Sequence, residues 1–93
     1  MDFEWDPAKA KTNIRKHRVT FDYAVRVFLD QNRIERPDEG EHDGEERWQV
    51  IGRVTEFVLV VIYVPRSDRI RIISARRAER NELIDYWNGP VSA

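Results

Sequence analysis

The spacing of apolar positions changes along the chain, and the first long segment has a helical period. Asp6 followed by Pro7 is a typical helix start, because aspartate caps the first turn and proline fits the first helical position. We predict a helix from Pro7 to about His17. Its narrow apolar stripe consists of Ala10, Ile14 and His17. Its neighbouring polar face carries Lys9, Asn13 and Lys16.

A second helix is predicted immediately after the first one. Thr20 is a suitable N-cap, and the apolar residues that follow repeat at helical spacing. These residues are Phe21, Ala24, Val25, Phe28 and Leu29. The second helix is the better one to cover a core, in which we place Phe28.

The middle of the chain has the pattern of an antiparallel sheet. Extended runs with short connections follow one another, as in a meander. They span residues 46–54, 57–64 and 69–75. The run 57–64 is apolar on both faces, so it is the predicted central strand, with Val60 in the core. Residues 32–38 are a predicted edge strand, because Pro37 could not donate in a central ladder.

The alternation of the last run stops after Ala75, where charged helix formers begin. We predict a last helix from about Arg77 to Trp87, with Arg76 and Arg77 exposed at the junction between strand and helix. Its apolar stripe of Leu83, Tyr86 and Trp87 is too narrow to assign wholly to the core, so we expect part of it to be exposed. The predicted fold is therefore α+β. Two N-terminal helices pack on an antiparallel sheet of about four strands, and a C-terminal helix completes a single domain over residues 1–93.

Length and composition restrict the class of protein. A chain of 93 residues forms one domain with a thin core, and without cysteine it has neither disulfides nor thiolate metal sites. The longest apolar run, residues 57–64, is far shorter than the roughly 20 residues that span a bilayer. The acidic start of the chain lacks the features of a signal peptide. We therefore expect a soluble, cytoplasmic protein that contacts no membrane.

The formal net charge of −1 hides an uneven distribution of charge. Residues 38–46 hold six acids and no Lys or Arg, whereas residues 66–80 hold six arginines against Asp68 and Glu79. Guanidinium groups match phosphate oxygens and stay charged at any working pH. The candidate phosphate ligands are Arg47, Arg71, Arg76 and Arg77.

The plainer interpretation is that these arginines only solvate the surface. Arg71 would then face solvent on a strand, and Arg76 and Arg77 would lie on a helix face. Glu79 and Glu82 would pair with them there for little energy. For any single arginine, composition alone favours this interpretation.

Two residue types could exchange protons beside a bound phosphate. Glu46 shares a face with Trp48 and could take a proton from a ribose 2′-hydroxyl. His17 lies with Lys16 at a helix end, where cations are favoured, and could protonate a leaving 5′-oxygen. The alternatives are an acidic loop end for Glu46 and a hydrogen-bonded histidine at the core edge for His17.

The usual metal and nucleotide motifs are missing from the sequence. It has no glycine-rich phosphate loop and no spaced histidine pair, and His17 and His42 are its only imidazoles. Any catalysis would therefore use Arg, Lys, His, Glu and Tyr side chains. We expect neither a metal nor another cofactor.

Four blocks of the chain resemble the BrnT family of bacterial type II toxins in their order and spacing. They span residues 3–17, 19–28, 44–52 and 69–82. The resemblance implies a RelE-like fold and a metal-independent ribonuclease activity that arrests growth by cutting RNA. It also implies a BrnA-like antitoxin with a ribbon-helix-helix region. This partner would neutralise the toxin, and only the complex would bind the DNA of the shared operon.

The resemblance also assigns residues to a site. The matching polar positions are Lys16, His17, Glu46, Arg47, Arg71, Ser74, Arg76 and Arg77. The arginines would hold the scissile phosphate and offset transition-state charge, Glu46 or His17 would handle protons, and Lys16 and Ser74 would contact the substrate. One departure is Arg18, which stands where the family usually has glycine. Glycine there would be a left-handed helix cap, so Arg18 is either strained or ends the helix differently.

The leading hypothesis is therefore a ribonuclease toxin. The rival hypothesis is a non-catalytic interaction module that uses its arginine-rich face to dock an acidic or disordered segment of a partner protein. The uneven charge is consistent with both. RNA cleavage by the purified protein in EDTA would separate them.

Overall fold

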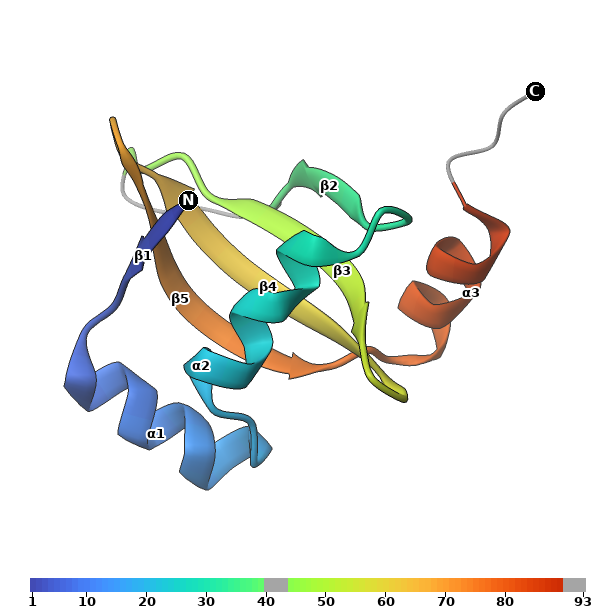
Figure 1. Cartoon of the computed structure of the whole chain (residues 1–93), viewed down its shortest axis with the longest axis horizontal. Coiled ribbons are helices and arrows are strands. Elements are labelled where there is room, and N and C mark those ends of the chain that lie inside the picture. Colours follow the sequence, from blue (N-terminus) through green and yellow to red (C-terminus); the bar gives the residue numbers. More distant parts are fainter. Residues whose placement is uncertain (40–43, 90–93) are drawn as a thin grey trace.

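A curved five-stranded sheet with helices on both sides forms the molecule (Figure 1). The computed structural model describes residues 1–39 and 44–89. Its strands are β1 (Asp2–Glu4), β2 (Ile34–Pro37), β3 (Trp48–Val54), β4 (Phe57–Pro65) and β5 (Arg69–Arg77). Its helices are α1 (Pro7–His17), α2 (Phe21–Ala24), the 3-10 helix η1 (Val25–Leu29) and α3 (Arg80–Asn88). This arrangement confirms the predicted α+β class, with helices before the sheet and one helix after it.

The order of the strands is β1-β5-β4-β3-β2. The antiparallel meander of β3, β4 and β5 is confirmed, with β4 in the centre and β2 at one edge. The additional strand β1 pairs in parallel with β5, so that Phe3 lies opposite Ile70. This short strand is held by its side chain as well, because the Phe3 ring lies 5.3 Å from the ring of Phe28.

Local sequence sets both ends of α1. The Asp6 carboxylate accepts a hydrogen bond from the Ala8 N–H at 2.8 Å, as expected of an N-cap. The helix ends where Arg18 adopts a left-handed conformation, with φ 60° and ψ 30°, and donates its N–H to the Ile14 carbonyl at 2.9 Å. The predicted limits of this helix are confirmed. Of the two predicted outcomes for Arg18 the strained one is observed, at a cost of about 1 kcal/mol.

The helix α1 turns its polar face toward the sheet instead of the predicted apolar stripe. Asn13 is 5% exposed, whereas Ile14 is 44% exposed and His17 is exposed as well. Ala10 is the one member of the stripe that packs against the core. The predicted stripe is therefore wrong, because the amide of Asn13 bonds to the edge of β5, as described below.

The second helix is shorter than predicted. Thr20 is its N-cap, since the hydroxyl accepts a backbone hydrogen bond at 3.2 Å, but the chain then continues as η1. The tighter turn buries Val27 and leaves Leu29 80% exposed, contrary to the predicted helical stripe. Gly52 of β3 allows this approach, because a Cβ there would lie 3.0 Å from the Cβ of Val27.

The sheet separates two apolar clusters. On the side of α1 and α2 the cluster includes Phe21, Ala24, Val27, Val50, Leu59, Val61 and Ile72. On the opposite side it comprises Ile51, Val58, Val60 and Tyr86. Phe28, which was predicted to lie in the core, is half-buried and packs edge-on against Tyr63, with the ring centres 5.3 Å apart.

Val60 supports the cluster under α3, and truncating it to alanine is expected to lower the free energy of unfolding by about 2 to 3 kcal/mol. The side chain is completely buried, so the lost methyl groups would leave a cavity beside Ile51 and Tyr86. Urea denaturation would measure the change. Ile84→Ala is the matched control, since Ile84 is 51% exposed and its truncation should cost little. An unchanged midpoint for Val60→Ala would mean that the sheet is misplaced.

Hydrogen bonds to Asp30 attach α3 to the rest of the fold. The Tyr86 hydroxyl donates to Asp30 Oδ2 at 2.5 Å, and burial together with this bond raises the pKa of Tyr86 to about 12. The same carboxylate accepts the N–H groups of Arg53 at 2.7 Å and Asn32 at 2.9 Å. Tyr86 is therefore buried, although it was predicted to be exposed. Trp87 is 63% exposed.

The strand β5 is longer than predicted, and the last helix begins later. Pairing continues beyond Arg77, because the Ala78 N–H donates to the Val58 carbonyl at 2.9 Å. The helix α3 starts only at Arg80, where the Glu82 carboxylate accepts the Glu79 N–H at 2.8 Å. The side chains at positions 76 and 77 are therefore arranged as on a strand.

Candidate functional site

An irregularity in β5 decides which of its side chains share a face. Simple alternation along β5 predicts that Arg71 and Ser74 point to opposite faces of the sheet. In the structure Ser74 lies opposite Ile62 and Arg71 lies opposite Val64, and these two β4 residues share one face. The pairing register shifts between these positions, as in a β-bulge. Arg71 and Ser74 consequently share the face that α3 partly covers.

The same register separates Arg76 from Arg77. Arg76 lies opposite Val60, whose side chain is in the cluster under α3. Arg77 lies opposite Leu59, in the cluster on the side of α1 and α2. Since neighbouring residues of a strand point to opposite faces, these two arginines do not converge on one phosphate.

A hollow of about 280 Å³ between α1 and β5 brings together three of the predicted site residues, Lys16, His17 and Ser74. The described residues that line it are Ala8, Lys9, Thr12, Asn13, Lys16, His17, Ile73 and Ser74. Lys16 and His17 come from the last turn of α1 and are exposed to solvent. The polar face predicted for the first helix is therefore the face that lines the hollow. We call this cavity the α1–β5 hollow.

Asn13 fixes the position of α1 beside β5. Its side-chain oxygen accepts the Ala75 N–H at 3.0 Å, and its amide nitrogen donates to the Ala75 carbonyl at 2.8 Å and to the Val19 carbonyl at 2.9 Å. The side chain thus pairs with the backbone of β5 as a neighbouring strand would. It does so at a part of β5 that β1 does not reach. The sequence pattern does not predict this role. Its one signal is that Asn13 lies on the predicted polar face between Lys9 and Lys16.

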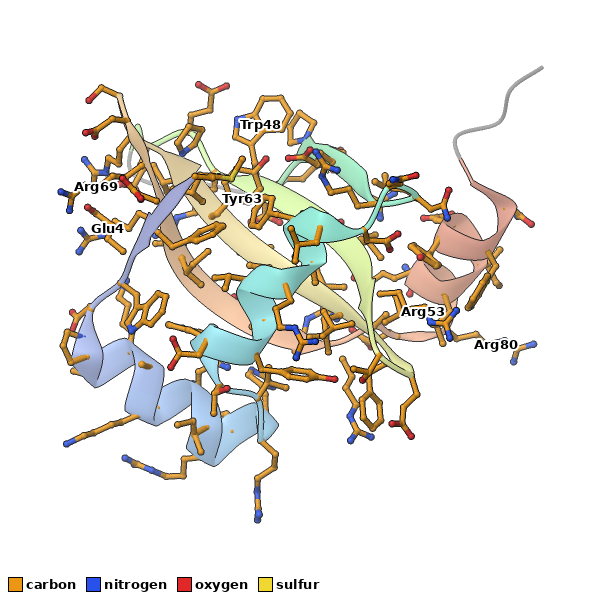
Figure 2. All side chains as sticks on the ribbon, viewed as in Figure 1. Glu4, Trp48, Arg53, Tyr63, Arg69 and Arg80 are labelled. Carbon is orange, nitrogen blue, oxygen red and sulfur yellow. The ribbon has the colours of Figure 1, made fainter. Side chains whose placement is uncertain are left out.

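Two of the predicted arginines, Arg71 and Arg47, are held by carboxylates. Arg71 Nη1 lies 2.9 Å from Glu4 Oε2, and Arg69 lies 3.7 Å from the other oxygen of Glu4. Figure 2 shows Glu4 and Arg69 at the end of the sheet far from α3. Arg47 Nε lies 3.3 Å from Glu45 Oε1. Glu46 precedes β3, is exposed, and does not line the α1–β5 hollow.

Arg76 forms the closest ion pair at the junction with α3. Both of its terminal nitrogens donate to the carboxylate of Glu82 at 2.7 Å, and Glu82 is only 6% exposed. These hydrogen bonds lower the pKa of Glu82 and raise the pKa of Arg76. The prediction that Arg76 lies exposed at this junction is therefore wrong, because its guanidinium anchors α3.

Replacing Arg76 with alanine is expected to lower the free energy of unfolding by about 2 to 3 kcal/mol, because Glu82 would keep a buried charge without its donor. The whole loss of stability should be present at pH values above the ordinary pKa of a glutamate. It should shrink as the pH falls through the lowered pKa of Glu82, since the wild type then loses the pair as well. Urea denaturation at several pH values measures both effects. Equal stability at neutral pH would show that the pair does not anchor α3.

The described residues offer little to a metal ion. In ranges 1–39 and 44–89 no group of three or more His, Asp or Glu side chains could hold one. His42, the second predicted imidazole, lies outside the described residues. Lys9 and Lys16 line the α1–β5 hollow, and no carboxylate from the described part of the chain does so.

Comparison with protein families assigns the chain. The family model of the ribonuclease toxin BrnT, of a type II toxin-antitoxin system, matches residues 5–82. The chain belongs to the BrnT family. A comparison with curated proteins found no match. The BrnT assignment confirms the predicted family and identifies a ribonuclease toxin of a type II toxin-antitoxin system, with an RNA target and a cognate antitoxin. Within its described residues, this BrnT chain has no helix that is long and apolar enough to cross a membrane.

Proposed function

We propose that the chain is a metal-independent endoribonuclease whose active site is the α1–β5 hollow. The observation that carries this proposal is the meeting of Lys16, His17 and Ser74 in one solvent-accessible cavity. When no metal takes part, an imidazole can exchange a proton with a reacting oxygen, and a cation can offset the charge that develops on the phosphate. The substrate is cellular RNA, which places the activity in the cytoplasm.

In the proposed mechanism the ribose 2′-oxygen attacks the adjacent phosphorus. Its proton passes to solvent water, the bond from phosphorus to the 5′-oxygen breaks, and a 2′,3′-cyclic phosphate forms. His17 protonates the leaving 5′-oxygen, because it is the side chain of the hollow whose residue type exchanges protons most readily near neutral pH. Lys16 stabilises the charge on the non-bridging oxygens, and β5 contributes the wall of the hollow at Ile73 and Ser74.

The electrostatics of the hollow support a reaction without a metal. Lys9 and Lys16 line it, and no carboxylate among the described residues does so. Such a lining attracts a phosphate and repels a divalent cation. Glu46 was a candidate base in the sequence, but it lies outside the hollow, so we assign it no proton transfer.

The purified chain, separated from its antitoxin, should cleave single-stranded RNA in EDTA and leave the DNA oligonucleotide of the same sequence intact. The DNA control lacks the attacking 2′-hydroxyl. Cleavage that stops in EDTA would contradict metal independence. Binding of RNA without any cleavage would favour the rival function, a non-catalytic module that docks a partner through its arginines.

We also propose that a BrnA-like antitoxin with a ribbon-helix-helix region binds the toxin and neutralises its ribonuclease activity. Formation of this toxin–antitoxin complex relieves the growth arrest. Only the complex binds the operon DNA. Two exposed apolar side chains of α3 support a partner surface there, since Trp87 is 63% exposed and Ile84 is 51% exposed. Arg53 would contact acidic or carbonyl groups of the antitoxin, because its guanidinium carbon lies 6.0 Å from the centre of the Trp87 ring.

Hydrogen exchange on the free and bound toxin tests where the antitoxin binds. We expect slower exchange in α3 and in β5 when the antitoxin is bound, because a stable complex buries on the order of 1,600 Å² and would occlude both elements. A mutant antitoxin that no longer binds serves as the control. Protection confined to residues 38–46 would mean that neutralisation acts from another face.

A further inference from the structure

A second hollow lies beside the carboxyl end of α1 and has a volume of about 240 Å³. Its lining is Arg18, Val19, Thr20, Tyr23, Phe57, Leu59 and Arg77. Lys16 and His17 line the α1–β5 hollow, and the next residue, Arg18, lines this one. The two cavities therefore flank the same helix end. Since Arg18 directly follows His17 in the chain, an extended ligand that passes this helix end can contact both cavities.

Arg18 occupies a backbone position that glycine adopts far more easily. Its φ of 60° is in the left-handed region, where a Cβ is unfavourable. Within residues 1–39 and 44–89, the Arg18 side chain forms no ion pair and no hydrogen bond. The described contacts therefore show no stabilising interaction that offsets the backbone strain. Strain of this kind concentrates at functional sites. Here the strained residue is Arg18, whose guanidinium-bearing side chain lines a cavity.

Arg77 presents a flat cationic surface in the same cavity. Its guanidinium carbon lies 4.2 Å from the centre of the Phe57 ring, so the ring supports one face of the guanidinium. Unlike Arg71 and Arg76, Arg77 forms no ion pair among the described residues. Among the described residues, no carboxylate lines this cavity. Two cations and two aromatic rings thus meet there without an acid from the described part of the chain.

We propose that this second hollow binds the nucleotide next to the scissile phosphate of a single-stranded RNA. Arg18 holds the phosphate of that nucleotide, and its base stacks on the Arg77 guanidinium, whose other face rests on Phe57. Stacking on guanidinium planes and aromatic rings is how proteins hold unpaired bases. This inference rests on the proposed function, because the RNA strand is placed by its scissile phosphate in the α1–β5 hollow.

The test uses Arg18→Gly, a variant that removes the cation and also relieves the backbone strain. Folding is therefore retained, and the Tm should rise by a few degrees. The probe is a fluorescent single-stranded oligonucleotide of 2′-O-methyl RNA, which the enzyme cannot cleave. We expect its Kd to increase about tenfold, and the slope of log Kd against log salt to fall by about 0.7, as for one lost phosphate contact.

Two further variants separate the roles of charge and stacking. Arg15→Ala removes the same charge from an exposed position of α1 outside both hollows, so its Kd should stay within about twofold of the wild type. Arg77→Lys keeps the charge and loses the planar group. It should weaken binding of the normal probe about five- to tenfold, and should not weaken binding of a probe that is abasic at the stacked position.

The outcomes distinguish this inference from the proposed function. One outcome is that the wild type cleaves RNA while Arg18→Gly and Arg77→Lys bind the probe as tightly as Arg15→Ala does. That result would contradict the proposed nucleotide subsite and would leave the proposed ribonuclease function intact. If the wild type neither cleaves RNA nor binds the probe, the proposed function fails and the subsite fails with it. Weakened binding of the antitoxin alone by Arg18→Gly would make this hollow a protein-binding surface and overturn the inference.

Discussion

Replacing His17 with alanine is expected to reduce the rate of RNA cleavage by about 10²- to 10³-fold and to leave the fold intact. His17 lines the α1–β5 hollow and supplies the proton for the leaving oxygen in the proposed mechanism. The side chain is exposed at the end of α1, so its removal should change the Tm little. Single-turnover kinetics in EDTA would measure the rate.

The control for this experiment is Arg15→Ala, which removes a cation from the same helix without touching the hollow. Its rate should remain near that of the wild type. Circular dichroism and thermal melting of both variants show whether a loss of rate reflects a loss of folding. A His17→Ala enzyme with full activity, or one whose activity falls only with its stability, would remove His17 from the mechanism.

The largest effect on stability is expected from Asn13→Ala, at about 3 to 4 kcal/mol in the free energy of unfolding. The amide makes three hydrogen bonds, two to Ala75 and one to Val19, and all of them are buried. Alanine would leave the backbone N–H and carbonyl of Ala75 and the carbonyl of Val19 without this partner, at roughly 1 to 3 kcal/mol for each unsatisfied group before relaxation. Urea denaturation would measure the loss.

Two variants help to interpret the Asn13 result. Lys11→Ala, an exposed change on the same helix, should alter the free energy of unfolding by less than about 0.5 kcal/mol. Asn13→Asp keeps the acceptor for the Ala75 N–H but loses both donated bonds and buries a charge, so it should also destabilise strongly. If Asn13→Ala were as stable as Lys11→Ala, α1 would not be held to β5 by this side chain.

Much of the fold was predictable because its signals are local. Asp6 and Pro7 specify the start of α1 through a cap that reaches only two residues along the chain. The doubly apolar run of β4 specifies a central strand because such a run is stable only when both faces are covered. These features need no knowledge of distant residues, and the structure confirms them.

The arrangement of the site was less predictable because it depends on distant contacts. Asn13 bonds to Ala75, which lies 62 residues away, and nothing near Asn13 in the sequence indicates that partner. The bulge that moves Ser74 onto the face of Arg71 leaves no clear mark in an alternating sequence. Glu82 was predicted to pair weakly on a solvated helix, whereas packing buries it against Arg76.

Chemical-shift mapping with an uncleavable 2′-O-methyl RNA tests most directly whether RNA binds in the α1–β5 hollow. Titration into the labelled protein should shift the backbone amides of Lys16 and His17 on α1, and of Ile73 and Ser74 on β5, in a saturable manner. The amides of Trp87 and its neighbours on α3 should change little without the antitoxin. Shifts confined to α3 and the adjoining ends of β2 and β3, with none around Lys16 or Ser74, would contradict the assignment of the α1–β5 hollow as the ribonuclease site.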